Sequence, residues 1–126
     1  MEKVILFGAS KMGEIAFEKL KEKYNIVGFV DNDKTKQDTY FCGLCVYSPT
    51  ILKDGNYNVI ICSIYDIEIS KQLIDYGVKK FYLFEINDQD YLIKDFNYSN
   101  IDDFSIKHNK ISLLLKIILV LIHKRC

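Results

Sequence analysis

The chain has 126 residues, of which 49% are hydrophobic and 27% are charged, so it is expected to fold as one globular domain rather than to be disordered. Seventeen basic side chains balance seventeen acidic ones, and the net charge is zero. A nucleic-acid binder is expected to carry a basic field, so we expect no nucleic-acid partner.

The charges are unevenly placed along the chain. Residues 1–84 carry eleven charges of each sign, and residues 85–104 carry six acidic side chains against Lys94 alone. Residues 105–126 carry five basic side chains and no acidic one. This pattern predicts a neutral body, an acidic connector and a basic tail.

The N-terminal residues and the four cysteines indicate the cellular compartment that we expect for the protein. The first residues lack the basic stretch, apolar run and small-residue cleavage site of a secretory signal, so we expect a cytoplasmic protein with reduced thiols. Cys42 and Cys45 have zinc-knuckle spacing, but no further ligand pair follows at comparable spacing. We expect no metal site and interpret the pair as small apolar residues beside a turn.

The spacing of the apolar residues predicts the first strands and the first helix. Residues 3–7 form a short apolar run typical of a strand buried on both faces. Residues 11–23 repeat apolar side chains at helical spacing, and residues 25–30 predict a second buried strand. Strand, helix and strand within about 30 residues make a βαβ unit.

The pattern then repeats up to residue 84. After a weak strand at 44–46, Ser48 and Pro49 predict the start of a short helix that Gly55 ends. A strand at 58–62, a helix that Gly77 stops and a strand at 80–84 follow, whereas residues 85–109 are predicted irregular or partly helical. We expect a three-layer α/β domain with a mostly parallel sheet of four to five strands.

The turn between the first strand and the first helix has the spacing of a phosphate-binding loop. Glycines at both ends of this turn approximate the dinucleotide fingerprint G-x-G-x-x-G, with a small serine in the middle position. Such a turn lets the backbone approach a diphosphate and directs free helix N–H groups toward it. The candidate residues are Gly8, Ala9, Ser10, Lys11, Met12 and Gly13.

Asp31 follows Gly13 by 18 positions, at the carboxyl end of the second strand. A carboxylate there accepts the ribose hydroxyls of a nucleotide and repels a 2′-phosphate, so NADH is expected over NADPH. Asn32 follows it, and Cys62 and Ser63 end another strand that faces the same crevice, so we include all three as candidate binding residues. For Ser63, a helix-capping role is the stronger alternative.

The motifs ILFGASKMG, IVGFVDND, KTKQ and GLCVYSP, between Val4 and Pro49, resemble the Rossmann-like N-terminal domain of bacterial sugar-nucleotide enzymes. Relatives of this kind include acetyltransferases of UDP-4-amino sugars and nucleoside-diphosphate-sugar dehydratases and epimerases of surface-polysaccharide synthesis. The resemblance implies a module that holds a sugar nucleotide, or NAD, through Gly8, Ser10, Gly13 and Asp31. The hexapeptide repeats of the acetyltransferases are absent from this sequence, so acetyl transfer is not expected.

No catalytic set is evident in the sequence. Tyr76 and Lys80 have the Tyr-x-x-x-Lys spacing of short-chain dehydrogenases and epimerases, but Gly77 between them is the expected helix stop. Their side chains would then project from different elements. The catalytic residues are therefore unknown, and we leave open whether the protein is an enzyme.

The C-terminal residues 111–122 are apolar nearly all round and are bracketed by basic side chains. As a helix they would be ~18 Å long, too short for a ~30 Å hydrocarbon core. Three interpretations follow: the helix packs on the domain or on a second copy, lies at the inner membrane face, or precedes a longer membrane segment cut from this chain.

Three parts are thus expected: a Rossmann-like nucleotide-binding domain at 1–85, an acidic connector at 86–109 and a basic apolar helix at 110–126. The first functional hypothesis is binding of a UDP-sugar, as an accessory or partial enzyme of surface-glycan synthesis. The alternatives are an NAD-dependent sugar-nucleotide oxidoreductase or epimerase completed by oligomerisation, and a binding-only interaction module. The expected cofactor is NAD or none.

Overall fold

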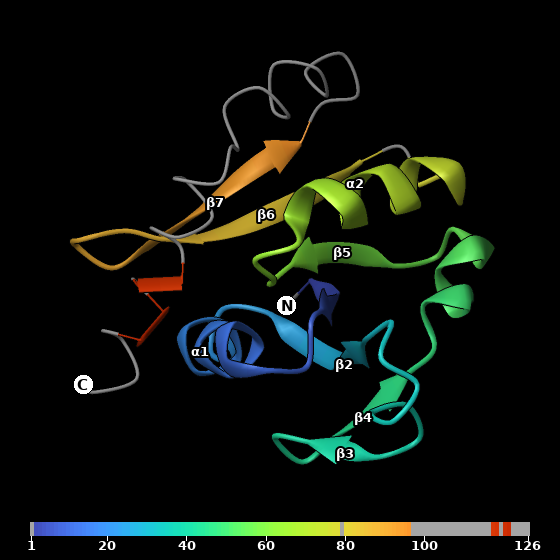
Figure 1. Cartoon of the computed structure of the whole chain (residues 1–126), viewed down its shortest axis with the longest axis horizontal. Helices are drawn as coiled ribbons and strands as arrows, with labels where there is room; N and C mark the ends of the chain where they lie inside the picture. The colour runs from blue at the N-terminus through green and yellow to red at the C-terminus, as the bar shows by residue number, and fades with distance from the viewer. Residues whose placement is uncertain (1, 79, 97–116, 119, 122–126) are drawn as a thin grey trace.

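The computed structural model describes residues 2–78, 80–96, 117, 118, 120 and 121. It is a mixed α/β fold with one seven-stranded sheet in the order β3-β4-β2-β1-β5-β6-β7 (Figure 1). The elements in chain order are β1 Lys3–Phe7, α1 Lys11–Leu20, β2 Asn25–Val30, β3 Tyr40–Phe41, β4 Leu44–Tyr47, the 3-10 helix η1 Pro49–Asp54, β5 Asn58–Ile61, α2 Asp66–Asp75, β6 Phe81–Ile86 and β7 Tyr91–Phe96.

The five central strands are parallel, and the two outer ones are not. β4, β2, β1, β5 and β6 pair in parallel, whereas β3 and β7 pair antiparallel with β4 and β6. The expected α/β class with a mostly parallel sheet is confirmed, and the expected number of four to five strands is too low by the two antiparallel edge strands. This order is the doubly wound one, with the winding direction reversing between β1 and β5.

Helices cover both faces of the sheet. Residues Val4 and Leu6 of β1 pack with Met12, Ala16 and Leu20 of α1 in one buried cluster. The alternate residues of β1, Ile5 and Phe7, pack with Leu52 of η1 and with Ile69 and Leu73 of α2 in the other. Because alternate side chains of a strand point to opposite faces, a continuous apolar run is what a strand between two helical layers requires.

The prediction of irregular or partly helical chain over residues 85–109 is wrong for residues 85, 86 and 91–96, which lie in strands. β6 extends to Ile86, and β7 pairs with it in register from Phe81↔Phe96 to Ile86↔Tyr91. The ring of Tyr91 stacks on Phe84 with centroids 5.3 Å apart. Cross-strand pairing and stacking therefore stabilise a strand that has no strong signal of its own.

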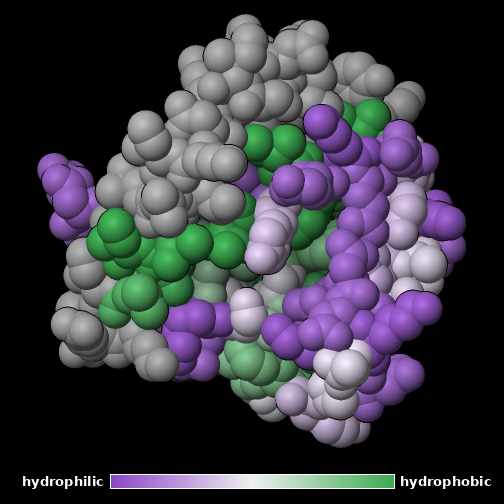
Figure 2. Space-filling model, viewed as in Figure 1, coloured by the Kyte–Doolittle hydropathy of each residue, from purple (hydrophilic) through white to green (hydrophobic). Residues whose placement is uncertain are grey.

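Most of the predicted C-terminal helix lies outside the described residues. The four described there, Ile117, Ile118, Val120 and Leu121, have helical backbone, and Val120 is buried in the cluster that contains α1. Figure 2 shows an apolar surface where Figure 1 places this stretch, and a hydrophilic one over α2. Within the described ranges, no helix is both long and apolar enough to cross a bilayer.

Two glycines allow α1 to start directly behind β1. A Cβ on Gly13 would lie 1.9 Å from the carbonyl oxygen of Gly8, and one on Gly8, whose φ is +127°, would lie 2.4 Å from the carbonyl oxygen of Cys62. These approaches are closer than any side chain permits. The glycine spacing is thus required for packing, whatever the turn binds.

We predict that Gly13→Ala lowers the free energy of unfolding by about 3 kcal/mol, because α1 must move away from the turn. The matched control is Gly55→Asn, since Gly55 has a φ of +74° and open space around it, and asparagine tolerates that backbone. Urea denaturation would measure both variants. Equal stability losses would show that the Gly13 contact does not constrain the fold.

Candidate functional site

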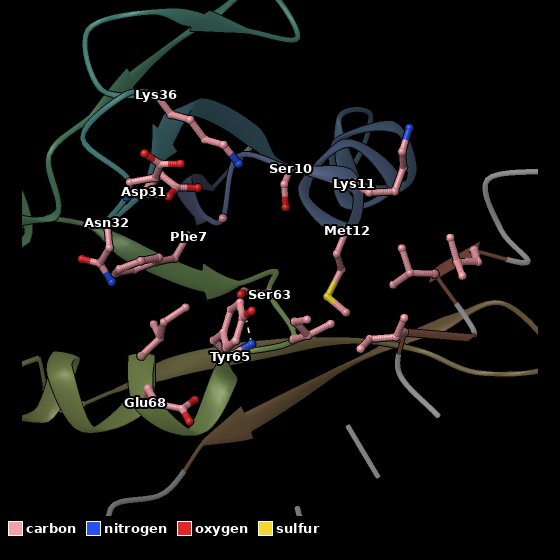
Figure 3. Close-up of a pocket in the computed structure, with 17 residues that line it drawn as sticks. Phe7, Ser10, Lys11, Met12, Asp31, Asn32, Lys36, Ser63, Tyr65 and Glu68 are labelled. Atoms are coloured by element: carbon pink, nitrogen blue, oxygen red, sulfur yellow. Dashed lines mark hydrogen bonds between the residues drawn. The ribbon is translucent and has the colours of Figure 1, made fainter. Parts of the chain in front are cut away.

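A cavity of about 680 Å³ opens at the carboxyl ends of β1, β2 and β5, at the point where the winding reverses (Figure 3). Open α/β sheets bind their ligands at this point. The lining residues are Phe7, Gly8, Ser10, Lys11, Met12, Asp31, Asn32, Asp33, Lys36, Ser63, Ile64, Tyr65, Glu68, Ile69, Ile117, Val120 and Leu121. They include seven of the ten predicted binding residues; Ala9, Gly13 and Cys62 are not among them.

The first two amides of the turn are used within the protein. The Gly8 N–H donates to the carbonyl oxygen of Val30 at 2.9 Å, and the Ala9 N–H donates to Oδ2 of Asp31 at 2.8 Å. Ala9 itself is buried in the core cluster with α1. Ala9 was predicted as a binding residue, but it does not line the cavity, because its amide and its side chain both face the protein.

The next amides have no such partner. In α1, the hydrogen bonds of the backbone amides begin at Glu14, whose N–H donates to the carbonyl oxygen of Ser10. The N-cap residue Ser10 makes no side-chain capping bond. Within the described chain, the N–H groups of Ser10, Lys11, Met12 and Gly13 donate to no acceptor, as expected of an uncapped first turn. The helix therefore begins with unsatisfied donors beside the cavity.

Asp31 joins the end of β2 to the turn. Its Oδ2 accepts the Ala9 N–H, and its Oδ1 accepts the Asp33 N–H at 2.8 Å. Its carbonyl oxygen accepts a bond from Nε2 of Gln37 at 2.9 Å. A carboxylate has about four acceptor sites, so both oxygens can still receive a hydroxyl. Asp31 thus holds the turn to the end of β2, and its carboxylate can still accept hydrogen bonds from a ligand.

Asn32 is bound to α2 by a reciprocal pair of amide hydrogen bonds. Its Nδ2 donates to Oε1 of Gln72 at 2.8 Å, and Nε2 of Gln72 donates back to its Oδ1 at 2.9 Å. Gln72 also donates to the hydroxyl of Tyr76 at 3.0 Å. Asn32 therefore lies on the cavity wall, but these bonds use its amide to hold the loop after β2 against α2.

Cys62 and Ser63 have different surroundings. Cys62 is fully buried, its Sγ donates to the carbonyl oxygen of Ile60, and burial raises the pKa of the thiol. The prediction that Cys62 contacts the ligand is corrected, because its side chain packs in the core on the α1 face. Ser63 lines the cavity, and its hydroxyl accepts the N–H of Tyr65, the N-cap residue of α2.

Four polar residues of the lining were missed by sequence reasoning: Asp33, Lys36, Tyr65 and Glu68. Lys36 is half-buried, and Figure 3 shows its ammonium group extending past Asp31 toward Ser10. Tyr65 is 58% exposed at the start of α2. The rule that the segments after parallel strands share one crevice could have located all four, because each follows β2 or β5.

The other candidate residues lie away from the cavity. Cys42 occupies the two-residue turn of the β3–β4 hairpin with a φ of +53°, and burial raises the pKa of its thiol. No group of three potential metal ligands occurs among the described residues. Tyr76 ends α2, and the Lys80 ammonium lies 5.7 Å from the centre of the Tyr82 ring, so the Tyr-x-x-x-Lys pair does not line the cavity.

Comparison with known proteins identifies the family. Residues 1–83 match the family described as C2185-like, N-terminal. The chain belongs to this family. No curated protein matches this C2185-like chain. The matched range extends from β1 into the first half of β6, and therefore contains the turn, the end of β2 and the start of α2.

Solved structures share the fold of this C2185-like domain at low identity. UDP-D-quinovosamine 4-dehydrogenase from Vibrio fischeri is 18% identical, with a TM-score of 0.63, covering 79% of this chain and 97% of that one. RSP, a Rex-family repressor, is 18% identical with a TM-score of 0.55, covering 92% of this chain and 63% of its own. The chain thus spans less than two thirds of the repressor. The similarity confirms a Rossmann-like fold.

The exclusion of nucleic-acid partners is wrong. RSP was also solved in complex with NAD⁺ and operator DNA, in a structure that is 19% identical with a TM-score of 0.51, covering 70% of this chain and 45% of that one. A DNA-binding repressor can therefore contain this fold. The net charge is a sum over the whole chain and does not report where charges gather, so a total of zero does not exclude such a partner.

We predict that Asp31→Ala lowers the free energy of unfolding by about 1–3 kcal/mol without any ligand, because the buried Ala9 N–H loses its acceptor. The control is Asp33→Ala, since the Asp33 carboxylate is exposed and, among the described residues, accepts hydrogen bonds only from Thr35, which also hold its pKa below the ordinary value. The control should cost less than about 0.5 kcal/mol in urea denaturation. If both variants lose the same free energy of unfolding, the bond from the Ala9 amide to Asp31 does not stabilise the fold.

Proposed function

We propose that the cavity binds a nucleotide through its diphosphate. The observation that carries this proposal is that Ser10, Lys11 and Met12, whose amides have no acceptor among the described residues, line one cavity at the reversal point of the sheet together with the half-buried Lys36. Helix N-terminal amides and lysines are both common phosphate ligands. The diphosphate would lie over Lys11, Met12 and Gly13, with the Lys36 ammonium on its other side.

The ribose would lie at Asp31. Its two carboxylate oxygens each have acceptor capacity left after binding the Ala9 and Asp33 amides. The negative charge would oppose a 2′-phosphate, so NAD(H) is favoured over NADP(H). Asp31 thus has two roles in the proposal: it holds the turn, and it accepts the ribose hydroxyls.

Two ligand classes have support. A UDP-sugar, handled as an accessory or partial enzyme of bacterial surface-glycan synthesis on the cytoplasmic side of the membrane, is supported by the motif resemblance and by the fold shared with UDP-D-quinovosamine 4-dehydrogenase. NAD, in an oxidoreductase completed by a second chain, is supported by Asp31 and by the fold shared with RSP, which was solved with NAD⁺ and with NADH.

We assign binding, and no chemical reaction, to the cavity. The described lining contains no histidine and no cysteine, and its one serine after β5 accepts a backbone bond from Tyr65. Binding is the function that these residues support.

We predict that Lys36→Gln weakens ADP and UDP binding about tenfold, because one charge-assisted contact to the diphosphate is lost. Adenosine and uridine, which lack the diphosphate, should be unaffected. The matched control is Lys34→Gln, two residues away on the same loop, because Lys34 is exposed and does not line the cavity. Isothermal titration calorimetry would measure all four ligands.

Two results would contradict the proposal. If the unaltered protein shows no saturable binding of ADP or UDP, the cavity is not a nucleotide site. If Lys36→Gln and Lys34→Gln weaken the binding of ADP and UDP equally, Lys36 does not contact the diphosphate, and the weaker binding reflects the loss of one positive charge.

A further inference from the structure

β7 forms one end of the seven-stranded sheet, and within the described chain it is paired on one side only. Its inner edge runs along β6, and no described strand pairs with its outer edge (Figure 1). The strand at the other end of the sheet, β3, has two residues, whereas β7 has six. The cavity lining includes no residue of β7. β7 thus presents a long outer edge that the proposed nucleotide site does not use.

The turn between β6 and β7 determines which backbone groups of β7 point outward. The Asn87 N–H donates to the carbonyl oxygen of Asp90 at 3.1 Å, so these two residues form a hydrogen-bonded pair of the antiparallel ladder. The register continues along β7 without a shift, and hydrogen-bonded pairs alternate with pairs that are not hydrogen-bonded. The residues whose N–H and C=O groups therefore point away from β6, and have no partner among the described residues, are Tyr91, Ile93 and Asp95.

The outer edge of β7 lacks most of the features that prevent edge strands from pairing. Proteins usually protect such an edge with a proline, a bulge, a very short strand or charged side chains. β7 has no proline, and its register with β6 is regular over all six residues. Its first three side chains are apolar or aromatic and half-buried, and the charge of Lys94 is paired with Glu85 of β6 at 3.1 Å. These features favour the addition of a further strand.

The sequence of β7 is complementary to itself when two copies run antiparallel. With Ile93 opposite Ile93 of the second copy, Tyr91 lies opposite Asp95, and Leu92 lies opposite Lys94. Each outward-pointing residue then belongs to a pair that exchanges two main-chain hydrogen bonds. Centring the pairing on Lys94 or Asp95 would place like charges opposite each other, which is destabilising. Centring it on Tyr91 or Leu92 would leave Asp95 beyond the strand of the second copy.

Two charges of opposite sign support the register centred on Ile93. The Lys23 ammonium donates to the Tyr91 hydroxyl at 2.7 Å and lies 5.3 Å from the centre of its ring. Among the described residues, neither Lys23 nor the exposed Asp95 forms an ion pair. Directly opposite residues share one face of a sheet, so Asp95 of the second copy would bring a carboxylate to the ring that binds Lys23. The two-fold axis repeats this arrangement.

We propose that β7 is an interaction surface for a second copy of this chain, with the two β7 strands antiparallel and Ile93 at the two-fold axis. The two seven-stranded sheets would then form one continuous sheet. A contact of this size is typical of weak, reversible dimers, so we expect a dissociation constant on the order of 10 µM. The proposal is independent of the nucleotide function and would stand if the cavity bound no nucleotide.

Amide hydrogen exchange, measured by NMR on the full chain at about 50 µM and about 1 mM, tests the pairing at each residue. The amides of Tyr91, Ile93 and Asp95 should exchange about threefold more slowly at the higher concentration, because mass action favours the dimer. The amides of Leu92 and Lys94, which point toward β6, should exchange at the same rate in both samples.

Sedimentation velocity of three variants tests the outer edge independently. Asp95→Pro removes an outward N–H and leaves the bonds between β7 and β6 in place, so it should weaken dimerisation about tenfold. Asp95→Ala keeps that N–H but removes the carboxylate, and it should weaken dimerisation about threefold. The matched control is Asp88→Ala, which removes the same charge from an exposed position in the turn and should change dimerisation less than about twofold.

Four results would overturn the proposal. A chain that stays monomeric at about 1 mM has no such interface. Slow exchange of the outward amides that is equal in both samples would show that a segment of the same chain occupies the edge. A dimer that Asp95→Pro leaves unchanged uses another surface, and equal effects of Asp95→Ala and Asp88→Ala would exclude the register centred on Ile93. If Asp95→Pro does not fold, the exchange measurement still decides, because it needs no variant.

Discussion

The hydrogen bond from the Ala9 amide to the Asp31 carboxylate connects the two segments that form the candidate site. One is the turn from β1 into α1, and the other is the end of β2. Together with the Gly8 amide, which donates to the Val30 carbonyl, this bond uses the first two donors of the turn within the protein. The amides that follow, from Ser10 to Gly13, donate to no acceptor among the described residues, and Ser10, Lys11 and Met12 line the cavity. The same residues thus determine how the turn is held and where an anion can bind.

Much of the fold could be predicted from local pattern. The buried run at Lys3–Phe7, the amphipathic α1 and the Ser48-Pro49 start of η1 each carry a signal within a few residues, and the structure confirms them. Ser48 accepts the Thr50 N–H, and Gly55 ends η1 in the left-handed conformation. Such signals depend only on neighbouring residues, which is why sequence alone reveals them.

The elements and contacts that were missed depend on residues far apart in the chain. β7 is stabilised by pairing with β6, and Lys94 within it forms an ion pair with Glu85 across the two strands. The burial of Cys62 and the Asn32–Gln72 bond likewise depend on packing between distant elements. The motif located Gly8, Ser10 and Asp31 at the cavity, whereas Lys36 and Tyr65 required the topology.

In the proposed site, the first-turn amides of α1 are free to bind a diphosphate, whereas the Gly8 and Ala9 amides are bound within the protein. Amide chemical shifts measured by NMR during titration with ADP or UDP test this difference directly. We predict saturable downfield shifts at Lys11, Met12 and Gly13, with the Ala9 amide, already bound to Asp31, changing much less. Saturable shifts confined to other parts of the chain, or a shift at Ala9 larger than those of the three, would contradict it.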